Sequence, residues 1–296
     1  MIKNFFKKNN IKVLENASLR NYNTYRIDSS CEYLVFPRDE QELILILKEL
    51  KKNNINYIIL GNGSNIILAK EYYQGVIIKL DELNQITYKE NLVTAGAGCS
   101  LIKLAIDTIK NGLSGLVFAT GIPGCVGAST AMNAGAYNSD MSQVVKSARV
   151  LNDKLEIVEL NNKDLSYSYR DSFLKRHKDY IVLSTTFELS KGNVEEMKNL
   201  AEERKQKRLN SQPLNFPNAG SVFRNPEGKY AGELIEKCHL KGYNINGAEV
   251  SNKHANFIIN SNHAQGKDII KLINKIKKEV KENYDVDLLL EQIIIE

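Results

Sequence analysis

The chain has 296 residues, of which 43% are hydrophobic and 25% are charged, and its formal net charge at pH 7 is +5. This length is enough for about two domains with a sizeable core, and the composition is typical of a globular protein. The positive charge is spread along lysine-rich segments, which argues against a basic nucleic-acid-binding tail and is compatible with a small anionic substrate.

The sequence indicates neither a targeting segment nor a metal site. The basic N-terminus MIKNFFKKNN lacks the apolar run of about 7–15 residues that a secretory signal needs, and no run approaches the roughly 20 residues of a membrane span. We therefore expect a cytoplasmic protein without a membrane partner. No Cys-x-x-Cys or His-x-x-x-His spacing occurs, so no metal site is expected. The cysteines are expected to be reduced and mostly buried: Cys31, Cys99, Cys125 and Cys238.

The first third of the chain alternates between strands and one helix. This helix follows Pro37 and has acidic Asp39 and Glu40 at its start and Lys51 and Lys52 at its end. These charges oppose the helix dipole at both ends, which favours a stable helix. The expected strands are at residues 21–36, 56–60, 66–69 and 75–80.

A glycine-rich corner, Gly61-Asn62-Gly63-Ser64-Asn65, separates two of these strands. Its polar side chains form turns, and they are also able to donate hydrogen bonds to a phosphate. A dinucleotide-binding G-x-G-x-x-G motif would need a third glycine and a following helix, whereas Ile66 and further β-branched residues follow here. Because Asp81 lies about twenty residues further on, where such a motif places its acidic residue, the dinucleotide alternative stays open.

A second glycine-rich segment runs from Thr120 to Asn138 and carries no charged side chain. Gly121, Gly124 and Gly127 recur at every third position in it. A backbone without bulky side chains is able to approach a ligand closely or to offer N–H groups to an anion. A tight corner between strands is the alternative, and the presence of two such segments favours the ligand interpretation.

Strands and helices alternate in the rest of the chain. Ser100 is a suitable N-cap for a helix that ends at Gly112. The composition shifts near a charged helix at 193–210, and we expect a domain boundary there. A later helix at 269–280 has isoleucines on one face and lysines on the other, which is typical of an amphipathic surface helix. The remaining expected elements are strands at 86–88, 92–98, 180–189, 254–260 and 286–296, a hairpin of 143–150 with 155–160, and a helix at 231–238.

Three polar side chains stand in aromatic, glycine-rich or apolar surroundings. Arg170 lies between aromatic residues and beside Asp171, which is able to orient a guanidinium; a structural salt bridge is the alternative role. Ser221 follows Ala219-Gly220, so a strand edge would present its hydroxyl to a cleft; without a G-x-S-x-G motif, a simple turn serine is the alternative. Glu291 lies inside LLLEQIII, which predicts a buried carboxylate; a glutamate on an exposed edge strand is the alternative.

Together these segments resemble one family. The order GNGSNIIL, GIPGCVGASTAMNAGAYN, YSYRDSF, NAGSVFRNP, AGELIE, VSNKHANFIIN and a late glutamate is similar to that of the UDP-N-acetylenolpyruvoylglucosamine reductases of bacterial peptidoglycan synthesis. The resemblance runs from about Thr24 to the C-terminus. It implies an α+β fold with an FAD-binding module of the vanillyl-alcohol-oxidase (PCMH) type in two α+β subdomains, and a C-terminal α+β substrate domain. The implied boundaries are 1–192 for the FAD-binding region, with subdomains of about 1–82 and 83–192, and 193–296 for the C-terminal domain.

The resemblance also implies the ligands and the site. It implies non-covalent FAD held by both glycine-rich segments, NADPH as the electron donor, and no metal. The implied catalytic residues are Arg170, Ser221 as proton donor and Glu291, and the implied substrate contacts are Tyr169, Asn225 and His254. The implied cofactor contacts are Gly61, Asn62, Gly63, Ser64, Asn65, Gly121, Ile122, Pro123, Gly124, Gly127, Ala128, Ser129, Asn133, Ala134 and Gly135.

The implied reaction is hydride transfer from NADPH through the flavin to the enolpyruvyl ether of UDP-N-acetylglucosamine enolpyruvate, which gives UDP-N-acetylmuramate. Arg170 and a protonated Glu291 would stabilise the negative charge that develops at the substrate carboxylate, and the Ser221 hydroxyl would protonate the neighbouring carbon. We expect a monomer without a nucleic-acid partner. Two alternatives stay open: another flavin oxidoreductase of this fold that oxidises an alcohol or sugar acid with oxygen, and a nucleotide-binding module without chemistry.

The chain departs from the family pattern at several positions. Ser29-Ser30 replaces a usual glycine pair, Ala128 and the two residues after it replace Gly-Ala-Val, and His239 replaces a common glycine. Leu289 stands where a glutamate is common, which leaves Glu291 as the catalytic candidate in that segment. The chain resembles the shorter members, which lack a tyrosine-bearing insertion. Because the change at Ala128 is small, FAD binding is expected to persist.

Overall fold

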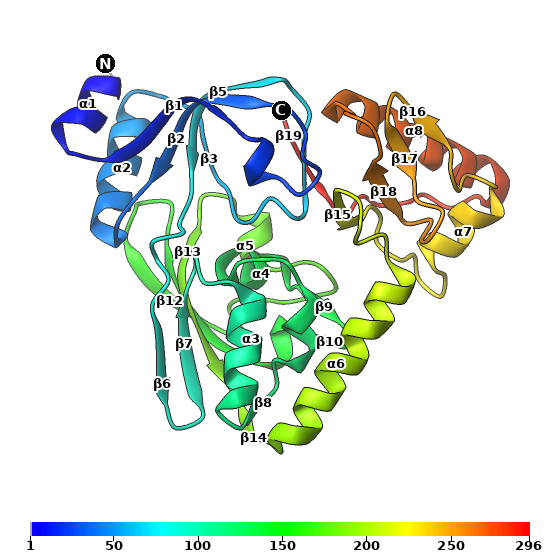
Figure 1. The fold of residues 1–296 in the computed structure, drawn as a ribbon. Coiled ribbons are helices and arrows are strands. Elements are labelled where there is room, and N and C mark those ends of the chain that lie inside the picture. Colours follow the sequence, from blue (N-terminus) through cyan, green and yellow to red (C-terminus); the bar gives the residue numbers. More distant parts are fainter. Residues whose placement is uncertain (1) are drawn as a thin grey trace. The chain divides into compact units, whose positions relative to one another are not determined.

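The computed structural model describes residues 2–296, which form two compact units, each built from separate stretches of the sequence (Figure 1). The predicted domains are each continuous in sequence, with a boundary near residue 193. This division stays a prediction. The first unit comprises the chain up to Glu15, Tyr33–Gly61 and Gly75–Gln206, and the second comprises Asn16–Glu32, Asn62–Gln74 and Lys207–Glu296.

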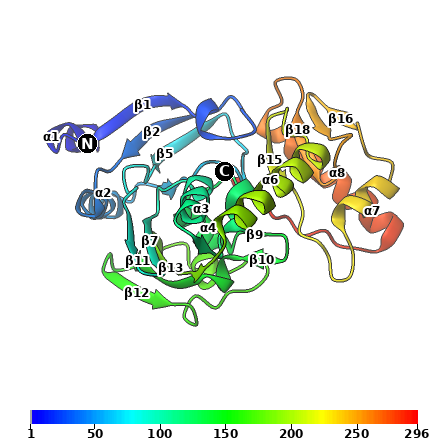
Figure 2. The ribbon, with the colours of Figure 1, turned by 60° about the horizontal axis from the view of Figure 1, so that its bottom comes forward.

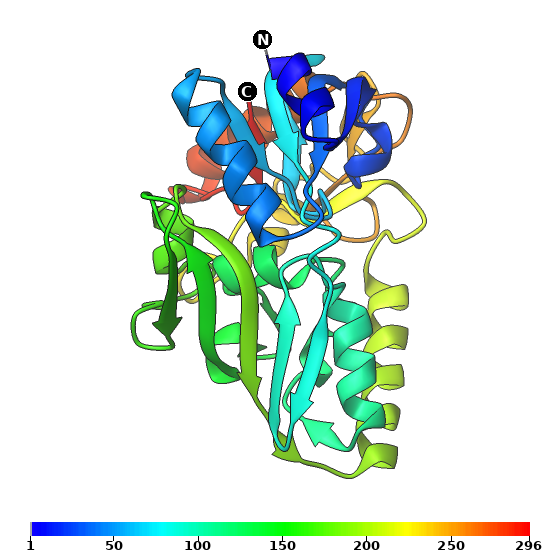
Figure 3. The ribbon, with the colours of Figure 1, turned by 90° about the vertical axis from the view of Figure 1, so that its left-hand side faces the viewer.

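The first unit contains an antiparallel five-stranded sheet (Figure 3), with the strand order β12-β11-β13-β7-β6. Its middle strand β13, Ile181–Glu188, is rich in β-branched residues and mostly buried. Helix α4, Val126–Met132, packs on this strand, and the hydroxyls of Thr130 and Thr185 lie 2.8 Å apart. The other strands are β6 Ile86–Lys89, β7 Leu92–Gly96, β11 Val145–Leu151 and β12 Ile157–Asn161.

Two predicted elements of this unit are confirmed close to their predicted bounds. Helix α2 spans Glu40–Lys52, and the Asp39 side chain accepts a hydrogen bond of 2.8 Å from the backbone N–H of Glu42. The predicted hairpin is formed by β11 and β12. The Asn152 side-chain oxygen closes its turn by accepting the backbone N–H of Glu156 at 2.8 Å.

Shorter elements complete the first unit. Helix α3, Leu101–Lys110, begins after the predicted N-cap Ser100, whose side chain accepts from the backbone N–H of Lys103. Strands β1 Lys12–Ser18, β2 Ser30–Phe36 and β5 Tyr72–Ile78 contribute residues to both units, in a sheet ordered β1-β2-β5-β3. The remaining elements are α1 Ile2–Lys8, β3 Tyr57–Ile59, β8 Leu113–Ser114, η2 Val117–Gly121, β9 Gly135–Ala136, β10 Ser139–Asp140, η3 Met141–Gln143, α5 Phe173–Arg176 and β14 Ser190–Lys191.

The second unit contains a four-stranded sheet ordered β15-β18-β17-β16, with all four strands labelled in Figure 1 and three of them, β15, β18 and β16, in Figure 2. Helix α8, Gly266–Tyr284, packs against β16 and β17 with its isoleucine face, which confirms the predicted amphipathic helix. Strand β19 pairs in parallel with β4 through three consecutive residue pairs. The elements are η1 Arg20–Tyr22, β4 Ile66–Leu68, β15 Asn218–Ser221, α7 Ala231–Lys237, β16 Asn244–Ile245, β17 Ala248–Val250, β18 Phe257–Asn260 and β19 Ile293–Ile295.

The predicted charged helix is α6, Val194–Ser211. Of its residues, Met197 is the buried one, and it packs with Ile109 and Val117 of the first unit. The charged side chains on the rest of its surface face water, as expected from the composition.

Two predicted strands are wrong over much of their length. In the segment 21–36, extended pairing begins at Ser30, because buried Asn23 forms a local turn by donating to the carbonyls of Leu19 and Ile27. In the segment 286–296, the regular strand is limited to β19, and Leu290 forms an isolated bridge with Phe223. The hydrophobic pattern of a sequence alone does not show whether the whole segment or only part of it forms a regular strand.

Other expectations concern burial and absent features. Cys31, Cys99 and Cys125 are buried and Cys238 is partly buried, which confirms the expected burial. Within residues 2–296, no helix is both long and apolar enough to cross a membrane. The same residues contain no group of three or more His, Cys, Asp or Glu side chains arranged to hold a metal ion.

Candidate active site

The two glycine-rich segments meet at Gly61 in the first unit. A Cβ atom at Gly61 would lie 2.9 Å from the Cys125 sulfur and 3.1 Å from the Ala128 Cβ, which is closer than ordinary packing allows. The backbone of the corner therefore rests directly on the start of α4. This close approach requires glycine at position 61, and it joins two of the predicted cofactor segments.

The segment from Thr120 to Asn138 packs with similar closeness. A Cβ atom at Gly127 would lie 2.8 Å from that of Ala97, and one at Gly124 would lie 2.8 Å from the Ser129 hydroxyl oxygen. Gly127 and Ser129 are buried, whereas the turn at 121–124 and Ala128 keep exposed surface. The segment thus presents backbone and small side chains at a surface that a flat or anionic ligand is able to approach.

Asn133 has an internal role within this segment. It ends α4 in the left-handed conformation with φ of 46° and is 1% exposed. Its side chain donates to the Ser168 carbonyl at 2.8 Å and accepts the backbone N–H of Ser142 at 3.0 Å. The structure therefore gives Asn133 a part in fixing the chain, and its neighbours Ala134 and Gly135 keep partial exposure.

The second half of the corner belongs to the second unit. Gly63 has φ of +65°, and a Cβ there would lie 2.1 Å from the Tyr22 carbonyl oxygen, so any other residue would be strained. The Asn65 side chain donates to the Glu291 carbonyl at 3.2 Å, and the Asn65 carbonyl accepts from the backbone N–H of Ile293 at 2.9 Å. The corner is therefore bonded to the segment that carries the predicted catalytic glutamate.

Ser221 and Glu291 lie on two backbone segments that are bonded to each other in the second unit. The backbone N–H of Glu291 donates to the Val222 carbonyl at 2.8 Å, and the N–H of Arg224 donates to the Leu289 carbonyl at 2.9 Å. Ser221 therefore directly precedes a residue that is bonded to Glu291. Both side chains are partly exposed, so Glu291 lies between the buried and the exposed alternatives that its sequence left open.

The end of strand β15 is irregular at Ser221. β15 is an edge strand, and its pairing with β18 shifts register between Asn218 and Ser221. Gly220 has φ of +75°, and a Cβ atom there would have no atom of the described residues within 4 Å, so the chain bends into open space. Ser221 therefore lies at the end of an edge strand, and the presentation of its hydroxyl to a cleft stays a prediction.

Gln292 fixes this arrangement and was not identified from the sequence. Its side chain is 3% exposed, donates to the Ala219 carbonyl at 3.0 Å and the Gly220 carbonyl at 3.3 Å, and accepts from the Tyr25 hydroxyl at 3.0 Å. Tyr25 is fully buried, and this burial raises the pKa of its phenol. The available signal was a polar amide inside the apolar run LLLEQIII, directly after the candidate glutamate.

Arg170 lies in the first unit, in a turn closed by a bridge between Ser168 and Asp171. Its backbone is left-handed with φ of 56°, and its guanidinium donates to the Gly135 carbonyl at 2.6 Å. The guanidinium also lies 5.1 Å from the ring centre of half-exposed Tyr169. Asp171, which the sequence suggested as its orienting partner, forms an ion pair with Arg176.

The two remaining predicted substrate contacts have structural partners. The Asn225 side-chain oxygen accepts the backbone N–H of Ala231 at 3.1 Å, at the start of α7. The His254 ring accepts the backbone N–H of Asn256 at 3.2 Å and packs on Phe257 with 4.8 Å between ring centres. Burial lowers the pKa of His254 from its usual value, so its neutral form is favoured. Asn225 is exposed and His254 is partly exposed.

The dinucleotide alternative for the corner is wrong. Strand β4, and not a helix, follows the corner. Asp81, the acidic residue of that alternative, forms an ion pair of 3.2 Å with buried Lys79. A phosphate-binding turn that opens a helix is therefore absent from this part of the described chain.

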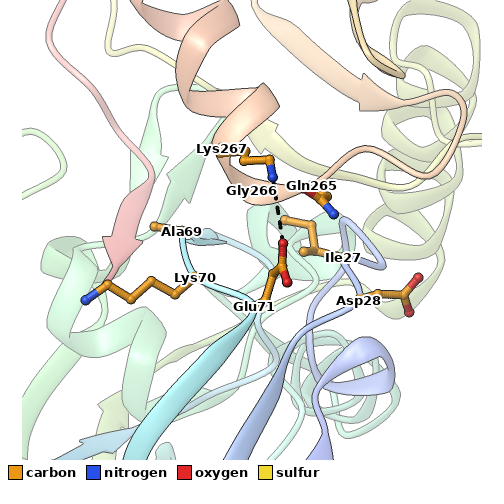
Figure 4. Close-up of a pocket in the computed structure, with 8 residues that line it drawn as sticks. All are labelled: Ile27, Asp28, Ala69, Lys70, Glu71, Gln265, Gly266 and Lys267. Carbon is orange, nitrogen blue, oxygen red and sulfur yellow. Dashed lines mark ion pairs between the residues drawn. The ribbon is translucent and has the colours of Figure 1, made fainter.

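Two surface pockets of the second unit contain none of the predicted site residues. One has a volume of about 230 Å³ and includes the ion pair of Lys267 and Glu71, whose atoms lie 3.7 Å apart (Figure 4). The other has a volume of about 580 Å³ and lies beside Leu214 and Phe216. The predicted site is defined by close backbone packing and hydrogen bonds, and not by these pockets.

Comparisons with known proteins agree with the geometry at Gly61. Residues 31–161 match the model of an FAD binding domain, and the backbone cradle formed by Gly61, Gly124 and Gly127 is compatible with a flat, anionic cofactor. The protein is thus an FAD-dependent oxidoreductase with an α+β fold of the predicted flavin-binding type. Residues 212–295 match the model of the UDP-N-acetylenolpyruvoylglucosamine reductase C-terminal domain. The chain belongs to the UDP-N-acetylenolpyruvoylglucosamine reductase family, because relatives of that name are 40% and 41% identical to it over 96% and 92% of its length.

Relatives of that name are similar along almost the whole chain. The reductase of Bacillus pumilus (strain SAFR-032) is 40% identical over 285 residues, which cover 96% of this chain and 94% of that protein. The reductase of Clostridium perfringens (strain SM101 / Type A) is 41% identical over 271 residues, covering 92% and 89%. The crystal structure of UDP-N-acetylenolpyruvylglucosamine reductase from Thermus caldophilus is similar with a TM-score of 0.81 and 29% identity, covering 97% and 99%.

Proposed function

We propose that this protein reduces the enolpyruvyl ether of UDP-N-acetylglucosamine enolpyruvate to UDP-N-acetylmuramate, with NADPH as electron donor, in peptidoglycan synthesis. The observation that carries the proposal is the hydrogen bond of 2.8 Å between the Glu291 N–H and the Val222 carbonyl, which joins the backbone of Glu291 to the residue that follows Ser221. Membership of the reductase family supports the same substrate. Bound FAD supplies the redox chemistry, and the protein supplies binding, orientation and protons.

The cofactor residues form one part of the proposal. The turn at 121–124, Gly127, and the corner at 61–65 would hold the cofactor through backbone N–H groups and close packing. Ala128, Ser129 and the segment 133–135 would complete this wall. The Asn133 side chain would act on the cofactor indirectly, because its hydrogen bonds go to the protein chain.

The proton donor in this proposal is the Ser221 hydroxyl. A hydroxyl is a weak acid in water, but it is able to protonate a carbanion-like carbon when it is held at hydrogen-bonding distance in a site that excludes water. The irregular edge of β15 at Gly220 gives the hydroxyl a partly exposed position. The carbon that receives the proton lies next to the substrate carboxylate.

Glu291 and Arg170 would stabilise the negative charge that develops on the substrate carboxylate. Arg170 supplies a permanent positive charge, and its bond to the Gly135 carbonyl together with the Tyr169 ring limits the positions of the guanidinium. Glu291 in its protonated form would donate a hydrogen bond. Tyr169, Asn225 and His254 would contact other parts of the substrate.

The test compares Ser221→Ala with Ser261→Ala as a matched control. Ser261 is also partly exposed and lies at the end of a strand in the second unit, and its hydroxyl donates to the Gly247 carbonyl. The visible absorbance of each protein is followed anaerobically, first with NADPH and then with UDP-N-acetylglucosamine enolpyruvate. Wild type and the control should bleach with NADPH and regain colour only with the substrate.

Ser221→Ala should bleach normally and regain colour about 10²–10⁴ times more slowly, the usual contribution of one positioned acid. Unchanged turnover in Ser221→Ala would refute the serine assignment. A wild-type protein that NADPH does not bleach, or that regains colour with oxygen and not with the enolpyruvyl substrate, would refute the proposed function.

A further inference from the structure

Lys79 is a buried cation that the proposed reaction does not use. It follows strand β5 and is 4% exposed, and its neighbours in the sequence, Ile78 and Leu80, are also buried. Its ammonium donates to the Gly61 carbonyl at 2.6 Å and forms an ion pair of 3.2 Å with Asp81. Lysine is rarely buried to this extent unless its charge is compensated. The question is therefore how much each of the two contacts contributes to that compensation.

The ion pair with Asp81 explains only part of this burial. The Asp81 side chain is 50% exposed, so water screens its attraction for the ammonium. The bond to Gly61 is shorter, and its acceptor is a backbone carbonyl two residues after the end of β3. Besides its burial, Lys79 is therefore notable because its ammonium group bonds to the backbone of the glycine corner.

The backbone holds Lys79 in register with the corner. The N–H of Lys79 donates to the Val35 carbonyl at 2.9 Å, and the N–H of Leu60 donates to the Ile78 carbonyl at 2.9 Å. These bonds continue the pairing of β5 with its neighbours to the last residue before Gly61. The backbone at Lys79 is thus held by hydrogen bonds to the segments on both sides of β5, and from this position the ammonium bonds to the Gly61 carbonyl.

The peptide between Gly61 and Asn62 transmits the effect of this charge. It is trans, so its carbonyl and its N–H point in opposite directions. A cation bonded to the carbonyl polarises the peptide and makes the N–H of Asn62, on the opposite side, a stronger hydrogen-bond donor. A stronger donor at this position favours an anionic ligand of the corner.

We propose that Lys79 is a positioning residue for the cofactor: it fixes the Gly61–Asn62 peptide and strengthens its N–H as a donor to the cofactor diphosphate. This inference rests on the proposed assignment of the corner at 61–65 to FAD. It adds a residue that contacts the corner from the protein side and that acts on the diphosphate through the backbone.

The test measures flavin affinity, not turnover. FAD is removed from the full-length wild type and from Lys79→Met, Lys79→Gln and Asp81→Asn, and each protein is titrated with FAD and with riboflavin by flavin fluorescence. Riboflavin lacks the phosphates, so it reports on the rest of the cofactor site. Lys79→Gln retains a donor without the charge, and Asp81→Asn retains the bond to Gly61 while removing the ion pair.

We expect Lys79→Met to bind FAD about 10–100 times more weakly, as for loss of a charged hydrogen bond, with riboflavin affinity almost unchanged. Lys79→Gln should lie between Lys79→Met and wild type, and Asp81→Asn should stay within about threefold of wild type, as for a half-exposed ion pair. The ratio of FAD to riboflavin affinity in wild type should fall as salt is raised.

Wild-type affinity for FAD in both Lys79 variants would overturn the inference. An equal loss of FAD and riboflavin affinity would also overturn it, because it would indicate a general structural role. If circular dichroism shows that Lys79→Met is unfolded, Lys79→Gln decides by the same comparison. A wild-type protein that binds riboflavin as tightly as FAD would instead refute the assignment of the corner to the diphosphate.

Discussion

Replacing Gln292 by methionine tests the hydrogen bonds that hold Ser221 and Glu291 in place. Methionine has a similar length, so the packing volume is kept while both polar ends are lost. The Tyr25 hydroxyl and the Ala219 carbonyl would remain buried without their partner, whereas water is able to reach the partly exposed Gly220. At about 1–3 kcal/mol for each of the two buried groups left without a partner, we expect a loss of roughly 2–6 kcal/mol in the free energy of unfolding.

The assay is urea unfolding followed by far-UV circular dichroism, since the chain has 14 tyrosines and no tryptophan to report on unfolding by fluorescence. Gln74→Met is the control, because Gln74 is exposed on β5, and it should change stability by less than about 0.5 kcal/mol. Tyr25→Phe removes the hydroxyl that Gln292→Met leaves without a partner, so the double variant should lose less stability than the sum of the single variants.

A Gln292→Met protein as stable as wild type would refute the assigned role of the amide. So would strict additivity of the two substitutions. If the assignment is correct, turnover should also fall, because the amide bonds the backbone before Ser221 and directly follows Glu291.

Two further predictions test the glycine contact and the buried histidine. Gly61→Ala should lower the free energy of unfolding by about 1–3 kcal/mol and weaken FAD binding. Adding Cys125→Ala should restore part of the stability and of the FAD affinity, because it removes the sulfur that lies 2.9 Å from the new Cβ atom. If the effects of the two substitutions are simply additive, the contact between positions 61 and 125 is contradicted. Because burial lowers the pKa of His254, the unfolded chain takes up a proton near pH 6.5 before the folded one does, so stability should fall as the pH drops from about 7 to 5. Urea midpoints should depend less on pH in His254→Gln than in wild type, and an identical dependence would contradict this assignment.

Local patterns were sufficient to predict the regular elements. Helix α2 was predictable because its cap, its terminal charges and its apolar face agree, and all three are local features. The hairpin of β11 and β12 was predictable for the same reason, since Asn152 closes its turn within a few residues. The fold class required the motif order, because no local pattern states how the sheets are connected.

The site was predictable only where the residue type itself is informative. Glycine at 61 and 127 indicates a close approach without revealing the partner, and the partners proved to be Cys125, Ala128 and Ala97. Gln292 is separated from its partner Tyr25 by 267 positions in the sequence, so no periodicity relates the two residues. The roles of Gln292 and Lys79 arise from contacts between distant segments, and these required the structure.

The hydrogen bonds between the second glycine-rich segment and the arginine turn connect two parts of the proposed mechanism. The carbonyl of Ala131 accepts from the Ser172 hydroxyl at 2.6 Å. Two residues on, the Asn133 side chain donates to the Ser168 carbonyl at 2.8 Å.

The third contact is the bond of 2.6 Å from the Arg170 guanidinium to the Gly135 carbonyl. Arg170 is held in a left-handed backbone conformation, with φ of 56°, that costs a non-glycine residue about 1–2 kcal/mol. These three bonds are able to offset that cost, so the wall proposed for the cofactor also maintains the conformation of the turn that carries the arginine.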